Sequence, residues 1–153
     1  MTNPRVEAIY IGPDTEQPMQ LVERVKAVSG RGLEGDRYFA KEGTFSRKEG
    51  PGRDVTLIEA EAVEQASAIY EVDFHSSETR RNIVTRDVPL NHLLDKEFTV
   101  GGVRMRGVKL CEPCGHLERV TAKGVKQPLI HRGGLRADIL SDGEISVGDR
   151  VTY

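Results

Sequence analysis

Short runs of alternating apolar and polar residues, separated by turns that contain glycine, most constrain how this chain can fold. The first run covers residues 6–11 and stops at a Gly-Pro pair, and the second covers 19–28 and stops before Gly30. Alternation with a period of two is typical of a strand with one buried face. Further strands are predicted at 54–58, 82–85, 97–100, 103–108, 135–140, 144–147 and 150–153, the last three as a closing meander.

Helical periodicity is confined to a few places. Residues 59–70 carry Ala62, Val63 and Ala66 at helical spacing, which predicts one full helix. Residues 90–94 are expected to form a single helical turn, and Pro113 suits the start of a short helix that runs to about residue 119. The pair Gly101-Gly102 between two alternating runs predicts a tight hairpin. The fold class is therefore mainly β, a small β-barrel with a few helical insertions.

The length of 153 residues is typical of one domain, so 1–153 is predicted to fold as a single unit. Residues 30–53 are rich in Gly, Arg and Lys and lack periodicity, which predicts a long loop that is mobile around 41–52. Loops of this length are usually functional or disordered.

No run of about 20 apolar residues is present, and the first residues do not resemble a signal peptide. A cytoplasmic protein without a membrane span is therefore expected. The two cysteines, Cys111 and Cys114, are only three positions apart. In a chain without an export signal, such a pair favours reactive or metal-binding thiols over a structural disulfide.

The net charge of -2 hides an uneven distribution. Residues 80–136 contain 12 Lys and Arg against 5 Asp and Glu, a charge of +7, whereas the rest of the chain has 10 basic and 19 acidic residues, a charge of -9. The total excludes a wholly polybasic nucleic-acid binder. The basic middle predicts that this part of the chain meets an anionic ligand.

Several roles are open for the two cysteines. A zinc site can be assembled from Cys111, Cys114, His116 and His131, although no second Cys-x-x-C pair is present. A thioredoxin-like dithiol requires a βαβ frame, which the pattern here does not predict. One cysteine can instead hold a cofactor that carries a metal, with the other incidental, and both can simply be small buried residues.

Arginines flank the cysteine pair on both sides, at 80–82 (Arg-Arg-Asn) and at 132–136 (Arg-Gly-Gly-Leu-Arg). Guanidinium groups grip phosphates and carboxylates through paired hydrogen bonds, and neighbouring glycines allow main-chain N–H groups to approach the same anion. Arginine-rich turns are also often simply solvated. By itself, the Gly35-Asp36-Arg37 run can be no more than a turn with an Asp cap.

An ordered set of short motifs resembles the MOSC domain across nearly the whole chain. The motifs are Gly32-Leu33-Glu34-Gly35-Asp36-Arg37, Asp54-Val55-Thr56-Leu57-Ile58, Arg80-Arg81-Asn82-Ile83-Val84-Thr85, Leu90-Asn91, Phe98-Thr99-Val100-Gly101, Glu112-Pro113-Cys114, Arg132-Gly133-Gly134-Leu135-Arg136-Ala137 and Val147-Gly148-Asp149. The resemblance implies a β-barrel with a cleft that binds the molybdenum cofactor, a pterin that bears a phosphate and a molybdenum held by a dithiolene.

The resemblance also implies roles for single residues. Cys114 matches the cysteine that the family uses as molybdenum ligand or sulfur carrier. A soft thiolate suits both tasks. The residues expected to bind the cofactor are Asp36, Arg37, Arg80, Arg81, Asn82, Arg132, Gly133 and Arg136.

Two activities occur among proteins of this kind. One is the reduction of N-hydroxylated compounds, which for this chain requires a separate electron-transfer protein. The other is sulfur carriage for the assembly of the cofactor or of metal-sulfur centres, which requires a sulfur donor. The pterin is the main expected partner, and neither a membrane nor a nucleic acid is expected.

Two non-enzymatic functions are alternatives. The first is an anion-binding or nucleic-acid-binding domain, against which it counts that Phe98 is the only aromatic residue between Arg80 and Arg136. The second is a structural domain stabilised by zinc through Cys111 and Cys114.

Overall fold

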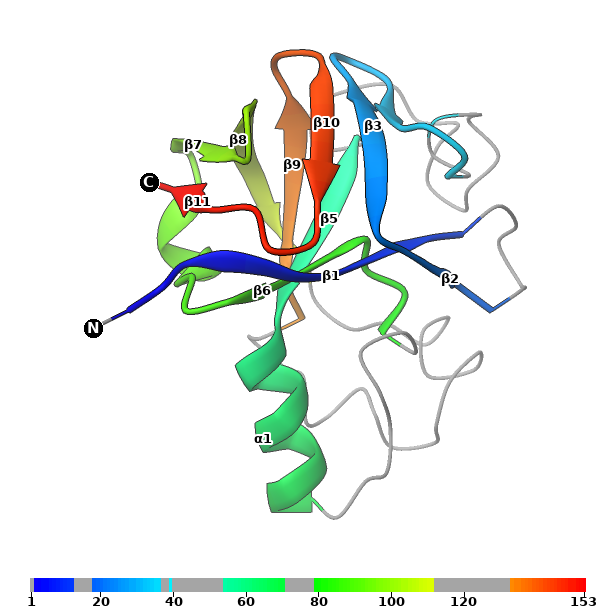
Figure 1. Ribbon diagram of the computed structural model, residues 1–153. Coiled ribbons are helices and arrows are strands. Elements are labelled where there is room, and N and C mark those ends of the chain that lie inside the picture. The colour runs from blue at the N-terminus through cyan, green and yellow to red at the C-terminus, as the bar shows by residue number, and fades with distance from the viewer. Residues whose placement is uncertain (1, 13–17, 37–38, 40–53, 71–78, 112–132) are drawn as a thin grey trace.

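The computed structural model describes residues 2–12, 18–36, 39, 54–70, 79–111 and 133–153. Within these ranges the protein is mainly β, with a strongly curled sheet and one α-helix (Figure 1). The expected fold class, mainly β with a barrel-like sheet and a few helical insertions, is therefore confirmed. Among the described residues, no helix is both long and apolar enough to cross a membrane.

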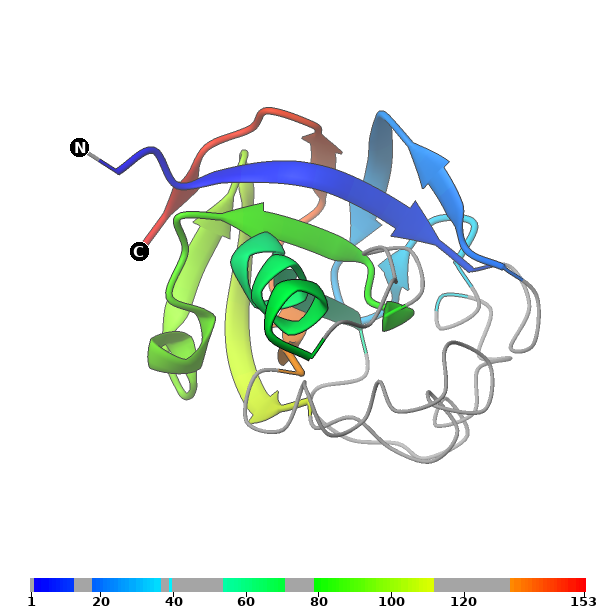
Figure 2. The ribbon, with the colours of Figure 1, turned by 90° about the horizontal axis from the view of Figure 1, so that it is seen from below.

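The larger sheet has eight strands in the order β11-β7-β8-β9-β5-β6-β1-β2. Their bounds are β1 Arg5–Ile11, β2 Gln20–Val22, β5 Val55–Glu59, β6 Ile83–Arg86, β7 Glu97–Val100, β8 Val103–Leu110, β9 Leu135–Ile139 and β11 Val151–Thr152. A second sheet has the order β10-β3-β4, with β3 Arg24–Val28, β4 Gly32–Leu33 and β10 Gly143–Ser146. Figure 2 shows the two sheets curling around a common interior.

One strand pair in the larger sheet is parallel, because β5 and β6 are joined by the helix α1 (Ala60–Tyr70). Parallel neighbours need such a crossover, whereas the remaining pairs are antiparallel. Ala60, Val63 and Ala66 of α1 pack on Ile58 and Val84 in a small apolar cluster of their own. The main core lies inside the curled sheets. It includes buried residues of every strand except β2, for example Ile9, Leu57 and Met105.

Three local predictions are confirmed. The predicted helix at 59–70 is observed at Ala60–Tyr70, and the predicted helical turn at 90–94 is the 3-10 helix η2, Leu90–Leu93. The Gly101-Gly102 hairpin is also present, since Val100 pairs with Val103. Gly101 has a φ of 60°, which is the left-handed conformation that a two-residue turn requires.

Three expectations about longer segments need correction. Residues 19–28 form two strands, because β2 pairs with β1 while β3 pairs with β10 and β4, and the chain passes between the sheets at Glu23. The predicted loop at 30–53 contains β4, while 37–38 and 40–53 lie outside the described residues. The last three strands form no meander: β9 joins β5 and β8, β10 joins β3, and β11 joins β7.

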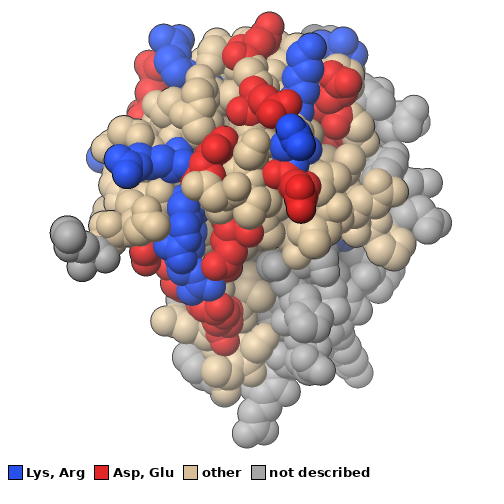
Figure 3. Space-filling model, in the orientation of Figure 1, with Lys and Arg blue, Asp and Glu red and all other residues tan. Residues whose placement is uncertain are grey.

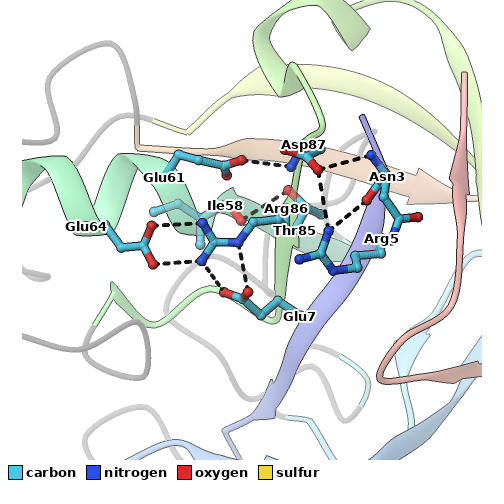
Figure 4. A network of polar contacts seen from close by, with 9 residues as sticks. All are labelled: Asn3, Arg5, Glu7, Ile58, Glu61, Glu64, Thr85, Arg86 and Asp87. Carbon is cyan, nitrogen blue, oxygen red and sulfur yellow. Dashed lines mark hydrogen bonds and ion pairs between the residues drawn. The ribbon is translucent and has the colours of Figure 1, made fainter. Parts of the chain in front are cut away.

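A network of charged side chains fastens α1 to β6 and β1 (Figure 4). Arg86 donates hydrogen bonds to both carboxylate oxygens of Glu7, at 2.8 and 2.9 Å, and to both of Glu64, at 2.9 and 2.7 Å. The hydrogen bonds from Arg86 lower the pKa of Glu64, and the two carboxylates raise the pKa of Arg86. Because Glu64 is largely exposed, the network fixes the direction of α1 more than it stabilises the fold.

Asp54 gives a testable pH dependence. Burial is the main cause that raises its pKa above 3.8, with the nearby Asp138 adding to it, while a hydrogen bond from the Ile139 N–H (2.9 Å) opposes it. The folded chain therefore holds this proton more tightly than the unfolded chain, and stability is lost as the pH rises above about 3.8. We expect the free energy of unfolding of wild type, minus that of Asp54→Asn, to fall as the pH is raised from 3 to 7 in urea titrations. A difference that stays constant or rises over this range contradicts the raised pKa.

Candidate functional site

Buried polar side chains gather in one region of the protein. Of the eight buried polar or charged side chains among the described residues, six lie here, and we call them the Arg81 cluster: Asp36, Thr56, Thr79, Arg80, Arg81 and Asn82. They come from the segment after β4, from β5 and from the segment that leads into β6. Such a concentration inside a β-barrel calls for an explanation, because buried polar groups are costly unless they are partnered.

Asn82 is the centre of the hydrogen bonds in this cluster. Its Oδ1 accepts from the main-chain N–H and the hydroxyl of Thr56, both at 3.1 Å. Its Nδ2 donates to the carbonyl oxygen of Tyr10 and to Oδ1 of Asp36, both at 3.2 Å. One fully buried amide therefore joins β1, β5 and the segment after β4.

Asp36 is held on two sides. Besides the bond from Asn82, its Oδ1 accepts a hydrogen bond of 2.7 Å from the N–H of Gly12, at the end of β1. The structure thus brings together Asp36 and Asn82, two residues that the sequence predicts to bind the cofactor. Both hold the walls of the site in place, whatever else they contact.

Arg81 reaches the opposite side of the site. Its Nε–H donates to the carbonyl oxygen of Gly133 at 2.7 Å, and its Nη2 donates to that of Cys111 at 3.5 Å. The residue is only 8% exposed. Among the residues that the structure describes, no carboxylate forms an ion pair with Arg81. Its positive charge is therefore buried among main-chain dipoles.

Arg80 adds a second buried cation and a strained main chain. It is 7% exposed and has a φ of 63°, in the left-handed region that residues other than Gly, Asn and Asp seldom adopt. A conformation of this kind costs about 1–3 kcal/mol and is found most often where function requires it. The two arginines and Asp36 leave the cluster with a net charge of +1.

Gly134 explains part of the Gly-Gly pair. It has a φ of 112°, and a Cβ added to it would overlap the carbonyl oxygen of Leu57 on β5. The glycine thus allows β9 to begin directly against β5. The sequence had suggested that these glycines let main-chain N–H groups approach an anion, and for Gly134 the close approach of two main chains is an additional reason.

Arg136 lies on β9, where it is the partner of Thr56 on one side and of Lys109 on the other. It is partly exposed, and Gly133 is buried. The described residues therefore place Asp36, Arg80, Arg81, Asn82, Gly133 and Arg136 around one region. The other predicted site residues, Arg37, Cys114 and Arg132, lie outside the described residues, as do His116 and His131.

Two members of the hydrogen-bond network are not among the residues predicted from the sequence. Thr56 is buried and contacts Asn82 through its hydroxyl, its N–H and its carbonyl oxygen. The signal that could have revealed it is a single polar residue within the otherwise apolar run 55–58. The carbonyl oxygen of Tyr10 had no such signal, because main-chain groups are the same at every position.

A groove of about 630 Å³ lies elsewhere, along the outer side of β1 and β2. It is lined by Glu7, Ala8, Tyr10, Leu21, Val22, Glu23, Arg24, Ser146 and Val147. None of the predicted site residues belongs to this lining, although Tyr10, whose carbonyl oxygen accepts from Asn82, does.

Charges on the visible face are mixed. Figure 3 shows Lys and Arg side chains interspersed with Asp and Glu over the face seen in Figure 1. A duplex-binding surface would present a continuous basic stripe. Two of the basic residues in 80–136, Arg80 and Arg81, are buried in the Arg81 cluster and add nothing to such a surface.

The chain was compared with protein families, with curated proteins and with solved structures. A family model described as the MOSC domain matches residues 45–152. No curated protein matches the chain in a sequence search.

Among solved structures, the YuaD protein from Bacillus subtilis superposes with a TM-score of 0.81 at 14% identity, covering 99% of this chain and 97% of that one. YiiM from Geobacillus stearothermophilus gives a TM-score of 0.69 at 13% identity, with 97% of this chain and 74% of that one covered. YiiM from Escherichia coli gives 0.65 at 17% identity, with 99% and 69% covered. These likenesses establish the fold.

Proposed function

The chain belongs to the MOSC domain family, and from this premise we propose that it binds the molybdenum cofactor beside the Arg81 cluster, with Cys114 as ligand of the molybdenum. Bound in this way, the protein acts as a small reductase of N-hydroxylated compounds or as a sulfur carrier. Either activity uses the same cysteine and the same group of cations.

The observation that carries the proposal is the buried positive charge of Arg81. Taking a guanidinium out of water costs several kcal/mol unless an anion or many hydrogen bonds replace the solvent. Arg81 has two hydrogen bonds to carbonyl oxygens and no carboxylate partner among the described residues. A bound phosphate or other anion would supply the missing negative charge.

The residues present fit the cofactor in charge and in donor chemistry. Arg80, Arg81, Arg132 and Arg136 would neutralise the pterin phosphate, and Gly133 has no side chain that would keep an anion away from the main chain. Asp36, Arg37 and Asn82 would shape the opposite wall. Cys114 follows Cys111 by three residues, so the covalent chain keeps their Cα atoms within about 11 Å of each other.

When bound, the cofactor supplies two-electron oxygen-transfer chemistry at molybdenum. The chain supplies a thiolate from Cys114 and the cations that retain the phosphate. As a reductase it needs a separate electron-transfer protein. As a carrier, Cys114 holds a persulfide; a nucleophile on the acceptor attacks the outer sulfur, the S–S bond breaks, and Cys114 leaves as a thiolate.

Neutralising the arginines should weaken cofactor retention. We expect Arg132→Gln and Arg136→Gln each to retain about tenfold less molybdenum after gel filtration, because each variant loses a charge-assisted hydrogen bond to the phosphate. Arg106→Gln, an exposed arginine on β8 within the same basic segment, is the matched control and should retain the wild-type amount. Unchanged molybdenum content in both site variants would contradict the proposed binding of the phosphate by these arginines.

The two activities are separated by a cyanide assay. Cyanide removes persulfide sulfur as thiocyanate, so thiocyanate released from wild type and not from Cys114→Ser indicates carriage. Turnover of an N-hydroxylated compound with an artificial electron donor indicates reduction.

The structure bears on the two alternative functions, nucleic-acid binding and structural zinc. Phe98 is buried at 3% exposure, so the only aromatic residue between Arg80 and Arg136 cannot stack on a base. For structural zinc, the described residues contain no group of three possible metal ligands, and three of the four proposed ligands lie outside those residues. Zinc found in place of molybdenum by elemental analysis would favour that reading.

A further inference from the structure

Arg81 contacts both residues that flank the segment 112–132. Cys111 comes directly before this segment and Gly133 directly after it, and the guanidinium donates to the carbonyl oxygen of each. We infer that Arg81 is a positioning residue: it joins the two ends of the segment that carries Cys114 and fastens them to the start of β6. We call this pair of hydrogen bonds the clamp. Its effect on the chemistry of Cys114 rests on the proposed function, but the clamp itself does not.

The need for a clamp follows from where the sheet ends. The last residue pair of the β8–β9 ladder is Leu110 with Leu135, and one more main-chain bond follows, from the Cys111 N–H to the Gly134 carbonyl oxygen at 2.7 Å. The 21 residues of 112–132 separate Cys111 from Gly133 in the chain. The Arg81 side chain supplies the next crosslink between the two sides.

The chemistry of the guanidinium suits this task. Its N–H groups are held in one plane, so a single side chain can serve two acceptors at a fixed separation. Cys111 and Gly133 are both buried, and their carbonyl oxygens require donors in the absence of water. A lysine would keep the charge but would concentrate its donors at one atom.

Cys114 lies within three residues of this clamp along the chain. Holding Cys111 therefore limits where the thiol can be, and releasing it lets the chain on both sides of the segment fluctuate more widely. The same arginine is the buried cation that the proposed anion would neutralise. Charge and positioning are thus two separable properties of one residue.

The test compares Arg81→Lys, Arg81→Gln and the exposed-arginine control Arg106→Gln with wild type, all as full chains without cofactor. We expect hydrogen exchange at the Cys111 amide to become about tenfold faster or more in both Arg81 variants, as expected if opening becomes easier by about 1.4 kcal/mol. The amides of Val103 and Met105, at the other end of β8, should stay protected in Arg81→Lys, which shows that the fold persists. Arg106→Gln should leave the Cys111 amide unchanged.

A second readout follows the thiol itself. In a Cys111→Ser background, where Cys114 is the only thiol, the rate of alkylation and its pH profile should change in both Arg81 variants and not in Arg106→Gln. Unchanged Cys111 exchange and unchanged alkylation in Arg81→Lys and Arg81→Gln would overturn the clamp. These measurements need no cofactor. If wild-type protein binds no molybdenum, the proposed function is refuted, whereas the expected changes in the two Arg81 variants would still support the clamp.

Discussion

Replacing Asn82 by alanine should destabilise the protein by about 3 kcal/mol or more. The side chain is fully buried and makes two hydrogen bonds through each end of its amide, to Thr56, Tyr10 and Asp36. Alanine would leave these groups buried without their partner, and each unsatisfied polar group costs about 1–3 kcal/mol. The midpoint of urea unfolding, with the slope checked for two-state behaviour, measures the loss.

Asn3→Ala is the matched control for this experiment. Asn3 is exposed, and the hydrogen bonds recorded for it use its main-chain N–H and carbonyl oxygen (Figure 4). Its side chain can therefore be removed for less than about 0.5 kcal/mol. If Asn82→Ala were no more destabilising than Asn3→Ala, the Asn82 network would not hold the site together.

Replacing Cys114 by serine should abolish molybdenum retention while the chain stays folded. A serine hydroxyl is a poor ligand for a soft metal, because it remains protonated at neutral pH and lacks a polarisable donor atom. Cys111→Ser is the control, since Cys111 contributes only its main-chain N–H and carbonyl oxygen to the contacts described above. Elemental analysis of gel-filtered protein and a thermal melt measure the two properties.

The two alternatives predict other results for this pair of variants. With structural zinc, both Cys111→Ser and Cys114→Ser should unfold the protein. With a simple anion-binding domain, neither variant should change the affinity for phosphate. A folded Cys114→Ser chain without molybdenum, beside a Cys111→Ser chain with it, is expected only for the proposed site.

Local features of this fold could be predicted from the sequence. The helix at 60–70 and the hairpin at Gly101-Gly102 depend on residues that are neighbours in the chain, so their periodicity and turn chemistry reveal them. The pairing of β9 with β5, of β10 with β3 and of β11 with β7 joins distant segments. Short strands carry no local record of such partners.

The segment 19–28 shows where the pattern misleads. Its alternation continues through Glu23, which predicts one strand. In the structure Leu21 is 67% exposed on β2, whereas Val25 and Ala27 are buried on β3. Leu21, Val25 and Ala27 all lie on the same side of the alternating pattern, yet only the last two are buried. The difference arises because the chain moves from one sheet to the other between them.

Residue type singled out members of the Arg81 cluster but not the contacts that each of them makes. Arg80, Arg81 and Asn82 stand out in the sequence as candidates for anion binding. Their contacts depend on residues 26 to 72 positions away, such as Thr56, Gly133 and Tyr10. The framework role of Asn82 and the two carbonyl contacts of Arg81 therefore became visible only in the folded chain.

The most direct test of the account is the amount of molybdenum and pterin per chain in wild-type protein purified from a host that makes the cofactor. Binding beside the Arg81 cluster with Cys114 as ligand predicts the two in equal amounts, approaching one of each per chain, and both lost from Cys114→Ser. Wild-type protein that carries neither molybdenum nor pterin when the host supplies both, or that retains them equally without the Cys114 thiol, would contradict it.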